Sequence, residues 1–172
     1  MRVVVADPVH YASVKRVLVD AFGGDDEASL VDELRAAGAA AVELVALDDQ
    51  GRVAGHVMFS NLRIECDGGA EGAVALAPLA VRLDCRNQGA GGLLVTHGLD
   101  ACRQLGKVAA VVLGDPGYYG RFGFSGDATQ GFSCVFEGPY LQALELAPGA
   151  LQRGQGRLIY ARAFDRFSDV SP

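Results

Sequence analysis

The chain has 172 residues, half of them hydrophobic, which is enough for one domain with a continuous apolar core. Its formal net charge of −6 excludes a general basic field that could hold a nucleic-acid backbone, and it would suit a cationic, amine-bearing substrate. No apolar run reaches the roughly 20 residues of a membrane helix, and no cleavable signal pattern follows Met1, so we expect a soluble, cytoplasmic protein without a membrane partner.

The first elements are a strand and two helices. Residues 2–6 form a β-rich run, and Asp7-Pro8 supplies a helix N-cap followed by a proline in the first turn. An apolar stripe at helical spacing then continues to Phe22, and Gly23-Gly24 ends it. A second helix is expected after the acidic residues 25–27, ending near Gly38.

Three strands should follow. Runs 42–47 and 53–64 flank Asp48-Asp49-Gln50-Gly51, which is hairpin turn chemistry, so we expect them to pair antiparallel, the later one as a half-buried strand. A turn is expected at 66–69. Residues 73–81 are apolar almost throughout and predict a central strand, but Pro78 cannot donate to a ladder. It therefore predicts a bulge, or a place where two strands part, next to residues 79–81.

Glycines at 89, 91 and 92 precede an amphipathic helix that should end at Gly106, and a buried strand is expected at 108–113. The remainder contains a turn-rich stretch at 114–126, weaker strand candidates at 132–136 and 158–162, and a polar tail at 165–172. We see no repeat or linker and predict a single domain over 1–172 with its core in 2–164.

A glycine-rich turn that leads from a strand region into a helix is a site for an anion, because free N–H groups and the helix dipole both point at the ligand. The dinucleotide fingerprint G-x-G-x-x-G fails because position 94 is Leu, and no Gly-Lys-Ser or Gly-Lys-Thr of a Walker loop is present. What remains is Arg86-x-x-Gly89-x-Gly91; the plain alternative is a glycine-rich helix start without a ligand.

This motif resembles the R/Q-x-x-G-x-G/A signature of the GNAT N-acetyltransferase superfamily. A second segment, Tyr118-Tyr119-Gly120-Arg121-Phe122-Gly123-Phe124, resembles the F-Y-x-x-x-G-F segment of the same superfamily, about thirty residues further on. With the preceding Gly114-Asp115-Pro116-Gly117, the chain looks most like a bacterial branch of predicted acetyltransferases with unassigned substrates. The resemblance extends from Arg2 to about Phe164.

The resemblance implies an α/β (α+β) fold with a mixed, mostly antiparallel sheet that splays open between its fourth and fifth strands. Acetyl-CoA would enter this opening, and no metal is implied. The family's pyrophosphate loop corresponds here to Arg86, Asn87, Gln88, Gly89, Ala90, Gly91 and Gly92. The family pairs pantetheine with the backbone after the bulge, which corresponds to Leu79, Ala80 and Val81.

Tyr119 aligns with the tyrosine that relatives use as general acid toward the departing thiolate, and a phenol with a pKa near 10 is protonated at neutral pH. The alternative for Tyr119 is a buried aromatic residue, and Tyr118 is the weaker candidate acid. The fourth strand lacks the carboxylate that many relatives use as base. Glu65, Asp67, Glu71 and His56 lie nearby in sequence, but none is assigned.

We therefore expect direct transfer of an acetyl group to a primary amine of a small molecule or protein. Cys85 beside the loop would allow a covalent acyl-enzyme, but direct transfer is simpler, and Ser125 lies in no G-x-S-x-G elbow. The four scattered cysteines predict neither a metal site nor a disulfide framework. Alternatives are a non-catalytic acyl-CoA sensor, an acyltransferase with another acyl-CoA, and a structural subunit; the oligomeric state stays open, a homodimer included.

Overall fold

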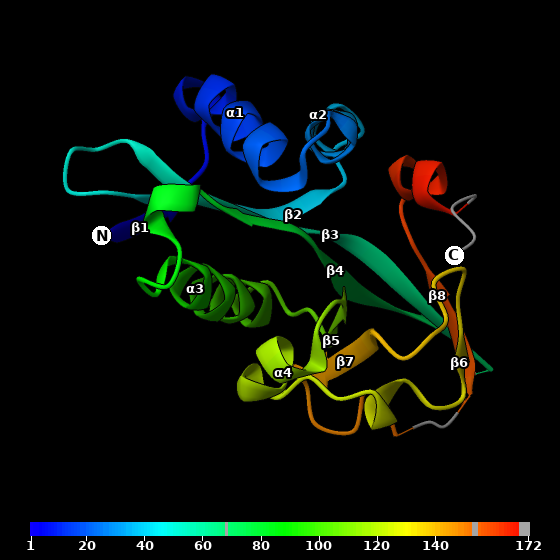
Figure 1. The fold of residues 1–172 in the computed structure, drawn as a ribbon. Helices are drawn as coiled ribbons and strands as arrows, with labels where there is room; N and C mark the ends of the chain where they lie inside the picture. Colours follow the sequence, from blue (N-terminus) through cyan, green and yellow to red (C-terminus); the bar gives the residue numbers. More distant parts are fainter. Residues whose placement is uncertain (68, 153–154, 169–172) are drawn as a thin grey trace.

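The computed structural model describes residues 1–67, 69–152 and 155–168. They form a twisted sheet between two layers of helix (Figure 1). The strands are β1 (Arg2–Val5), β2 (Ala40–Leu47), β3 (Val53–Cys66), β4 (Gly69–Val81), β5 (Ala109–Leu113), β6 (Phe132–Ser133), β7 (Leu141–Glu145) and β8 (Gly156–Ile159). The helices are α1 (Tyr11–Phe22), α2 (Asp26–Ala36), α3 (Ala90–Gln104) and the single turn α4 (Pro116–Tyr119).

The N-terminal helices begin and end as the sequence predicts. The Asp7 carboxylate accepts a hydrogen bond from the Val9 amide at 3.0 Å and caps a 3₁₀ turn, Pro8–His10, that leads into α1. Gly23 ends α1 with φ +78°, a left-handed conformation that glycine adopts without a Cβ clash. Helix α2 carries Asp26 and Glu27 in its first turn, where negative charge favours the helix dipole.

The main path of the sheet runs β1-β2-β3-β4-β5-β7, and only β4–β5 along it is parallel. The β4–β5 ladder begins at Val74 and ends where Leu76 pairs with Val112. Between the Phe59–Leu76 pair and the Val57–Leu79 pair, β4 has one residue more than β3. The Ala77-Pro78 peptide in this bulge is cis. Beyond Leu76, β4 pairs with β3 alone, so the predicted opening between the fourth and fifth strands is confirmed.

Two apolar clusters fill the space on the two faces of the sheet. One lies under α1 and α2 and includes Met58 and Ala80; the other lies under α3 and includes Val57 and Phe59. Residues 53–60 are consequently all buried. The prediction of a half-buried β3 is therefore wrong, because helices cover both of its faces.

The C-terminal third departs most from the predictions. The sequence did not predict β7, while β6 and β8 are shorter than the candidate runs, and β5 begins one residue late. The β3–β4 hairpin is longer than expected, and its predicted turn includes Gly68, which lies outside the described residues. Of the predicted polar tail, the described part lies in or next to a 3₁₀ turn, Arg162–Phe167, in which Arg166 bonds the Asp26 carbonyl at 3.1 Å. None of the described helices has the length and apolar character to cross a membrane.

Candidate cofactor and active site

The predicted anion loop forms a cradle of backbone amides at the start of α3. Asn87 has φ +59° and the N-cap Gly89 has φ +86°, so the chain curls with its N–H groups turned outward. The first backbone bond of the helix is donated by Leu93 to the Gly89 carbonyl at 3.0 Å. Residues 86–89 form a turn, and in the described part of the chain the amides of residues 87–92 donate no hydrogen bond of good geometry. A run of such donors at a helix N-terminus fits a pyrophosphate.

Contacts to the preceding turn hold this cradle in place. The Gln88 side-chain amide donates to the Asp84 carbonyl at 2.8 Å, and Arg86 Nε donates to the Val81 carbonyl at 3.4 Å. Ala90, the first residue of α3, has a buried side chain, so only its backbone can serve a ligand. Cys85 is also buried, and burial raises the pKa of its thiol above the ordinary value, which disfavours the thiolate that a covalent mechanism needs.

The open edge of β4 offers backbone groups to an extended ligand. Arg82 donates to the Ala54 carbonyl of β3 at 2.8 Å, and in an antiparallel ladder such bonds recur at every second residue. Ala80, which pairs with His56, therefore directs its N–H and C=O toward β3. Leu79 and Val81 direct theirs away from β3, to the edge that β5 has left.

Tyr119 lies at the C-terminus of α4, on the α3 side of the sheet. Its ring packs edge-on against Phe124 with centroids 5.9 Å apart, and lies so close to Gly114 that a Cβ there would be 2.4 Å from Tyr119 Cε2. Burial raises the pKa of Tyr119 to about 12. The phenol thus carries its proton at every physiological pH.

The structure brings two further residues to the cradle that sequence reasoning left aside. The Tyr118 hydroxyl lies 2.5 Å from the position of a Cβ on Gly91, so this glycine makes room for it. Arg121 stacks its guanidinium over the Tyr118 ring, 4.0 Å from the centroid. A cation and a hydroxyl are groups that bind phosphate well. The sequence signal for both residues is the Tyr118-Tyr119-Gly120-Arg121 segment.

The acidic base candidates lie far from the opening. The fourth strand begins at Gly69, earlier than predicted, so the prediction that it lacks a carboxylate is wrong: it contains Glu71. Glu71 and Glu65 lie at the β3–β4 hairpin end, where Glu65 pairs with Arg63 at 2.6 Å, and Asp67 follows in the turn. His56, in contrast, lies opposite Ala80 and is fully buried. Ser125 Oγ accepts the Asp127 amide at 3.1 Å and serves the turn.

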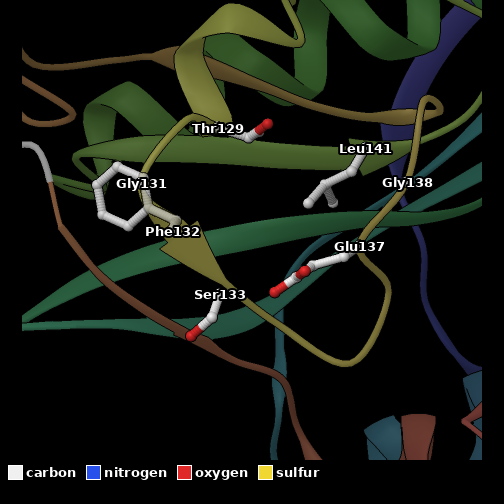
Figure 2. A pocket seen from close by; sticks show the side chains of 7 residues that line it. All are labelled: Thr129, Gly131, Phe132, Ser133, Glu137, Gly138 and Leu141. Atoms are coloured by element: carbon white, nitrogen blue, oxygen red, sulfur yellow. The ribbon is translucent and has the colours of Figure 1, made fainter.

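A polar hollow of about 390 Å³ lies between β6 and the start of β7, on the side of the sheet away from α3. Figure 2 shows Phe132 and Ser133 of β6 on one side of it and Glu137 and Leu141 on the other. The last residue of β5 that pairs with β4 is Val112. The next residue, Leu113, pairs with Leu141 of β7. In the described ranges, no group of three His, Cys, Asp or Glu side chains could hold a metal ion.

A splayed sheet with an amide cradle and a protonated phenol on the same side of it defines a site for an acyl-carrying nucleotide cofactor. Residues 11–124 match the Acetyltransferase (GNAT) family. The chain is 38% identical over 162 residues to the uncharacterized N-acetyltransferase YhbS of Escherichia coli K12, covering 93% of this chain and 96% of that protein.

Two solved structures are similar over nearly the whole chain. The YhbS structure from Escherichia coli in complex with CoA has a TM-score of 0.87 at 37% identity, covering 96% of this chain and 92% of that one. A GNAT acetyltransferase from Brucella melitensis in complex with acetyl-CoA has a TM-score of 0.79 at 34% identity, covering 95% and 97%. The chain belongs to the GNAT acetyltransferase family, and the predicted family and fold are confirmed.

Proposed function

We propose that this acetyltransferase moves the acetyl group of acetyl-CoA to a primary amine by direct attack in a ternary complex. The observation that carries the proposal is the run of free amides at residues 87–92 next to the open edge of β4. The cradle suits the pyrophosphate, with Arg121 as a nearby cation, and Leu79 and Val81 suit the amides of pantetheine. Acetyl-CoA supplies the activated thioester.

In this proposal the amine nitrogen forms a bond to the thioester carbonyl carbon while the carbon–sulfur bond breaks. The leaving sulfur takes up negative charge, and Tyr119 donates its phenolic proton to it. A pKa of about 12 keeps that proton available without making Tyr119 a strong acid. The phenolate is then reprotonated from solvent.

The acceptor would approach from the face opposite α3, by way of the hollow between β6 and the start of β7. Glu137 lines this hollow and accepts a hydrogen bond from the Cys134 amide at 3.2 Å through one oxygen, so its second oxygen can receive a donor. A carboxylate there suits an ammonium group, as does the net charge of −6. The cytoplasmic location and a homodimer stay predictions.

Calorimetric titration of acetyl-CoA into the wild type and a Gly89→Glu/Gly91→Glu variant tests the cofactor site, with folding checked by circular dichroism. Binding by the wild type that is lost in the folded variant would support the site. Thiol release from acetyl-CoA would then be followed with spermidine, tyramine, L-lysine ethyl ester and hydroxylamine. A wild type that binds no acyl-CoA, or that acetylates none of these amines, would count against the proposal.

A further inference from the structure

A buried charged cluster connects α1 and α2 to the sheet. His56 Nε2 lies 2.9 Å from Glu43 Oε1, and the same oxygen accepts from Arg35 Nη2 at 2.5 Å. Arg35 also donates from Nε to the other oxygen of Glu43 at 3.1 Å and stacks over the Tyr11 ring at 3.6 Å. Three secondary-structure elements, α2, β2 and β3, thus contribute the hydrogen-bonded groups, and α1 covers Arg35 with Tyr11.

The charge states in this cluster follow from its contacts. Burial alone raises the pKa of Glu43, but the hydrogen bonds from His56 and Arg35 outweigh burial and leave the pKa below its ordinary value. Glu43 is therefore a carboxylate and can only accept hydrogen bonds. Burial lowers the pKa of His56, and Glu43 offsets this only in part. His56 is therefore neutral at pH 7, with its proton on Nε2.

The second ring nitrogen of His56 has no partner. Nδ1 is buried and makes no hydrogen bond within the described residues, although the ring is 0% exposed. Most buried polar atoms are hydrogen-bonded, because an unpaired one costs about 1–3 kcal/mol, and in the described residues Ser60 Oγ is the other buried side-chain atom left unpaired. Neutral His56 with Nε2 protonated presents a bare lone pair at Nδ1. This is the arrangement of a base oriented by a carboxylate.

His56 also lies where a base is needed. It pairs with Ala80 on β4, next to Leu79 and within the segment that has lost its β5 partner. Cross-strand partners share a face, and Ala80 belongs to the cluster under α1 and α2, the face opposite α3. The residue of β4 opposite His56 is Ala80, whose side chain is a single methyl group. The ring is 0% exposed, so an amine in the opening cannot touch it, and the proton would pass to Nδ1 through one bridging water.

We propose that His56 Nδ1 accepts the proton that the amine loses before attack, with Glu43 and Arg35 as positioning residues. This inference rests on the proposed acetyl transfer. The ammonium N–H bond breaks and its proton passes to the bridging water, which releases one of its own protons to form the Nδ1–H bond. The freed nitrogen lone pair then attacks the thioester carbonyl. The resulting imidazolium is paired with the Glu43 carboxylate and returns its proton to solvent after the product leaves. The charged groups around the ring are Glu43 on β2 and Arg35 on α2, while β4 opposes it with Ala80.

The test compares acceptors that differ in their need for a base. At pH 7.5 a primary alkylamine such as spermidine is mostly protonated, whereas hydroxylamine is mostly neutral. Replacing His56 by Gln keeps a donor for Glu43 but removes the basic nitrogen. We expect kcat/KM for spermidine, or for the alkylamine of the panel with the highest turnover, to fall about 100-fold. The loss with hydroxylamine should be about fivefold or less.

The pH profile and a matched variant separate this role from a structural one. In the H56Q enzyme the alkylamine rate should keep rising tenfold per pH unit as the amine deprotonates by itself, while the wild type levels off once Nδ1 is free. His97 is exposed on α3, and the H97Q enzyme should match the wild type. Equal losses with both acceptors, or no loss, in a folded H56Q protein would overturn the assignment.

Nitrogen-15 NMR of the three histidines gives a readout besides activity. The His56 signal, identified by its disappearance in the H56Q spectrum, should show Nε2 protonated and Nδ1 bare at pH 7. The opposite tautomer would contradict the proposal. If the wild type acetylates no amine, the proposed function fails and takes this assignment with it. If the wild type acetylates an amine and H56Q does so equally well, the function stands and the assignment of His56 fails.

Discussion

The contact between α3 and the sheet allows a prediction whose size can be derived from the coordinates. Gly98 faces the fully buried ring of Phe59, and a Cβ on Gly98 would lie 2.0 Å from Cε2 and 2.7 Å from Cζ. Normal carbon contacts need about 3.5 Å, so a Gly98→Ala methyl requires α3 or the ring to move by about 1.5 Å. Overpacking of this kind costs about 1–3 kcal/mol, against a helix-propensity gain of about 1 kcal/mol.

Because the approach of 2.0 Å is severe, we expect Gly98→Ala to lower the free energy of unfolding by up to about 2 kcal/mol and Tm by up to about 4–8 °C. Urea and thermal denaturation followed by circular dichroism measure both quantities. Gly92→Ala, on the same helix, is the matched control, because its Cβ meets nothing within 4 Å. Phe59→Leu in the Gly98→Ala background should recover part of the loss. If Gly98→Ala is as stable as Gly92→Ala, the ring contact does not limit the packing of α3.

Three further predictions concern the site. Arg121→Ala should weaken acetyl-CoA binding about tenfold in calorimetry, because it removes the cation beside the cradle; unchanged affinity would place Arg121 outside the phosphate contacts. Tyr119→Phe should lower kcat about 100-fold with an unchanged Kd for acetyl-CoA, and the wild-type rate should show no loss up to pH 9, since the pKa of Tyr119 is about 12. The buried His56 predicts acid sensitivity. The pKa of His56 is lowered in the folded state by burial. Below about pH 6.5 the unfolded chain therefore binds a proton on this histidine that the folded chain does not bind, and stability falls as pH falls. Melting temperatures from pH 7.5 to pH 5 should decline more steeply for the wild type than for His56→Gln; parallel curves would refute this.

The features predicted correctly from the sequence are those with a short, local cause. Asp7 with the following proline specifies a helix start through one side chain and one fixed dihedral angle. Pro78 predicts the point where the sheet opens because proline cannot donate to a ladder, wherever the neighbouring strands lie. The glycines at 89 and 91 predict the amide cradle in the same way, since they act on their own backbone and on close approach to it.

The features that escaped prediction depend on register between distant segments. Glu43 meets His56 because β2 places Val45 opposite His56, and Glu43, two residues before Val45, lies on the same face. Nothing local in either strand indicates this contact. The strand β7 has the text Leu-Gln-Ala-Leu-Glu, whose residues favour helix, and it is a strand because the outer edge of β5 offers it a ladder from Ala109 to Leu113.

The extra residue in β4 also decides which side chain His56 meets. With it, Phe59 pairs with Leu76, Val57 with Leu79, and His56 with Ala80. A regular ladder continued from the Phe59–Leu76 pair would bring Leu79 opposite His56, because each residue of β3 would then oppose one of β4. Leu79 would fill the α1–α2 face with a large side chain, and the backbone groups now at the open edge would turn toward β3. The single bulge thus creates the open edge for the cofactor and, one residue further, the small neighbour that leaves His56 within reach of it.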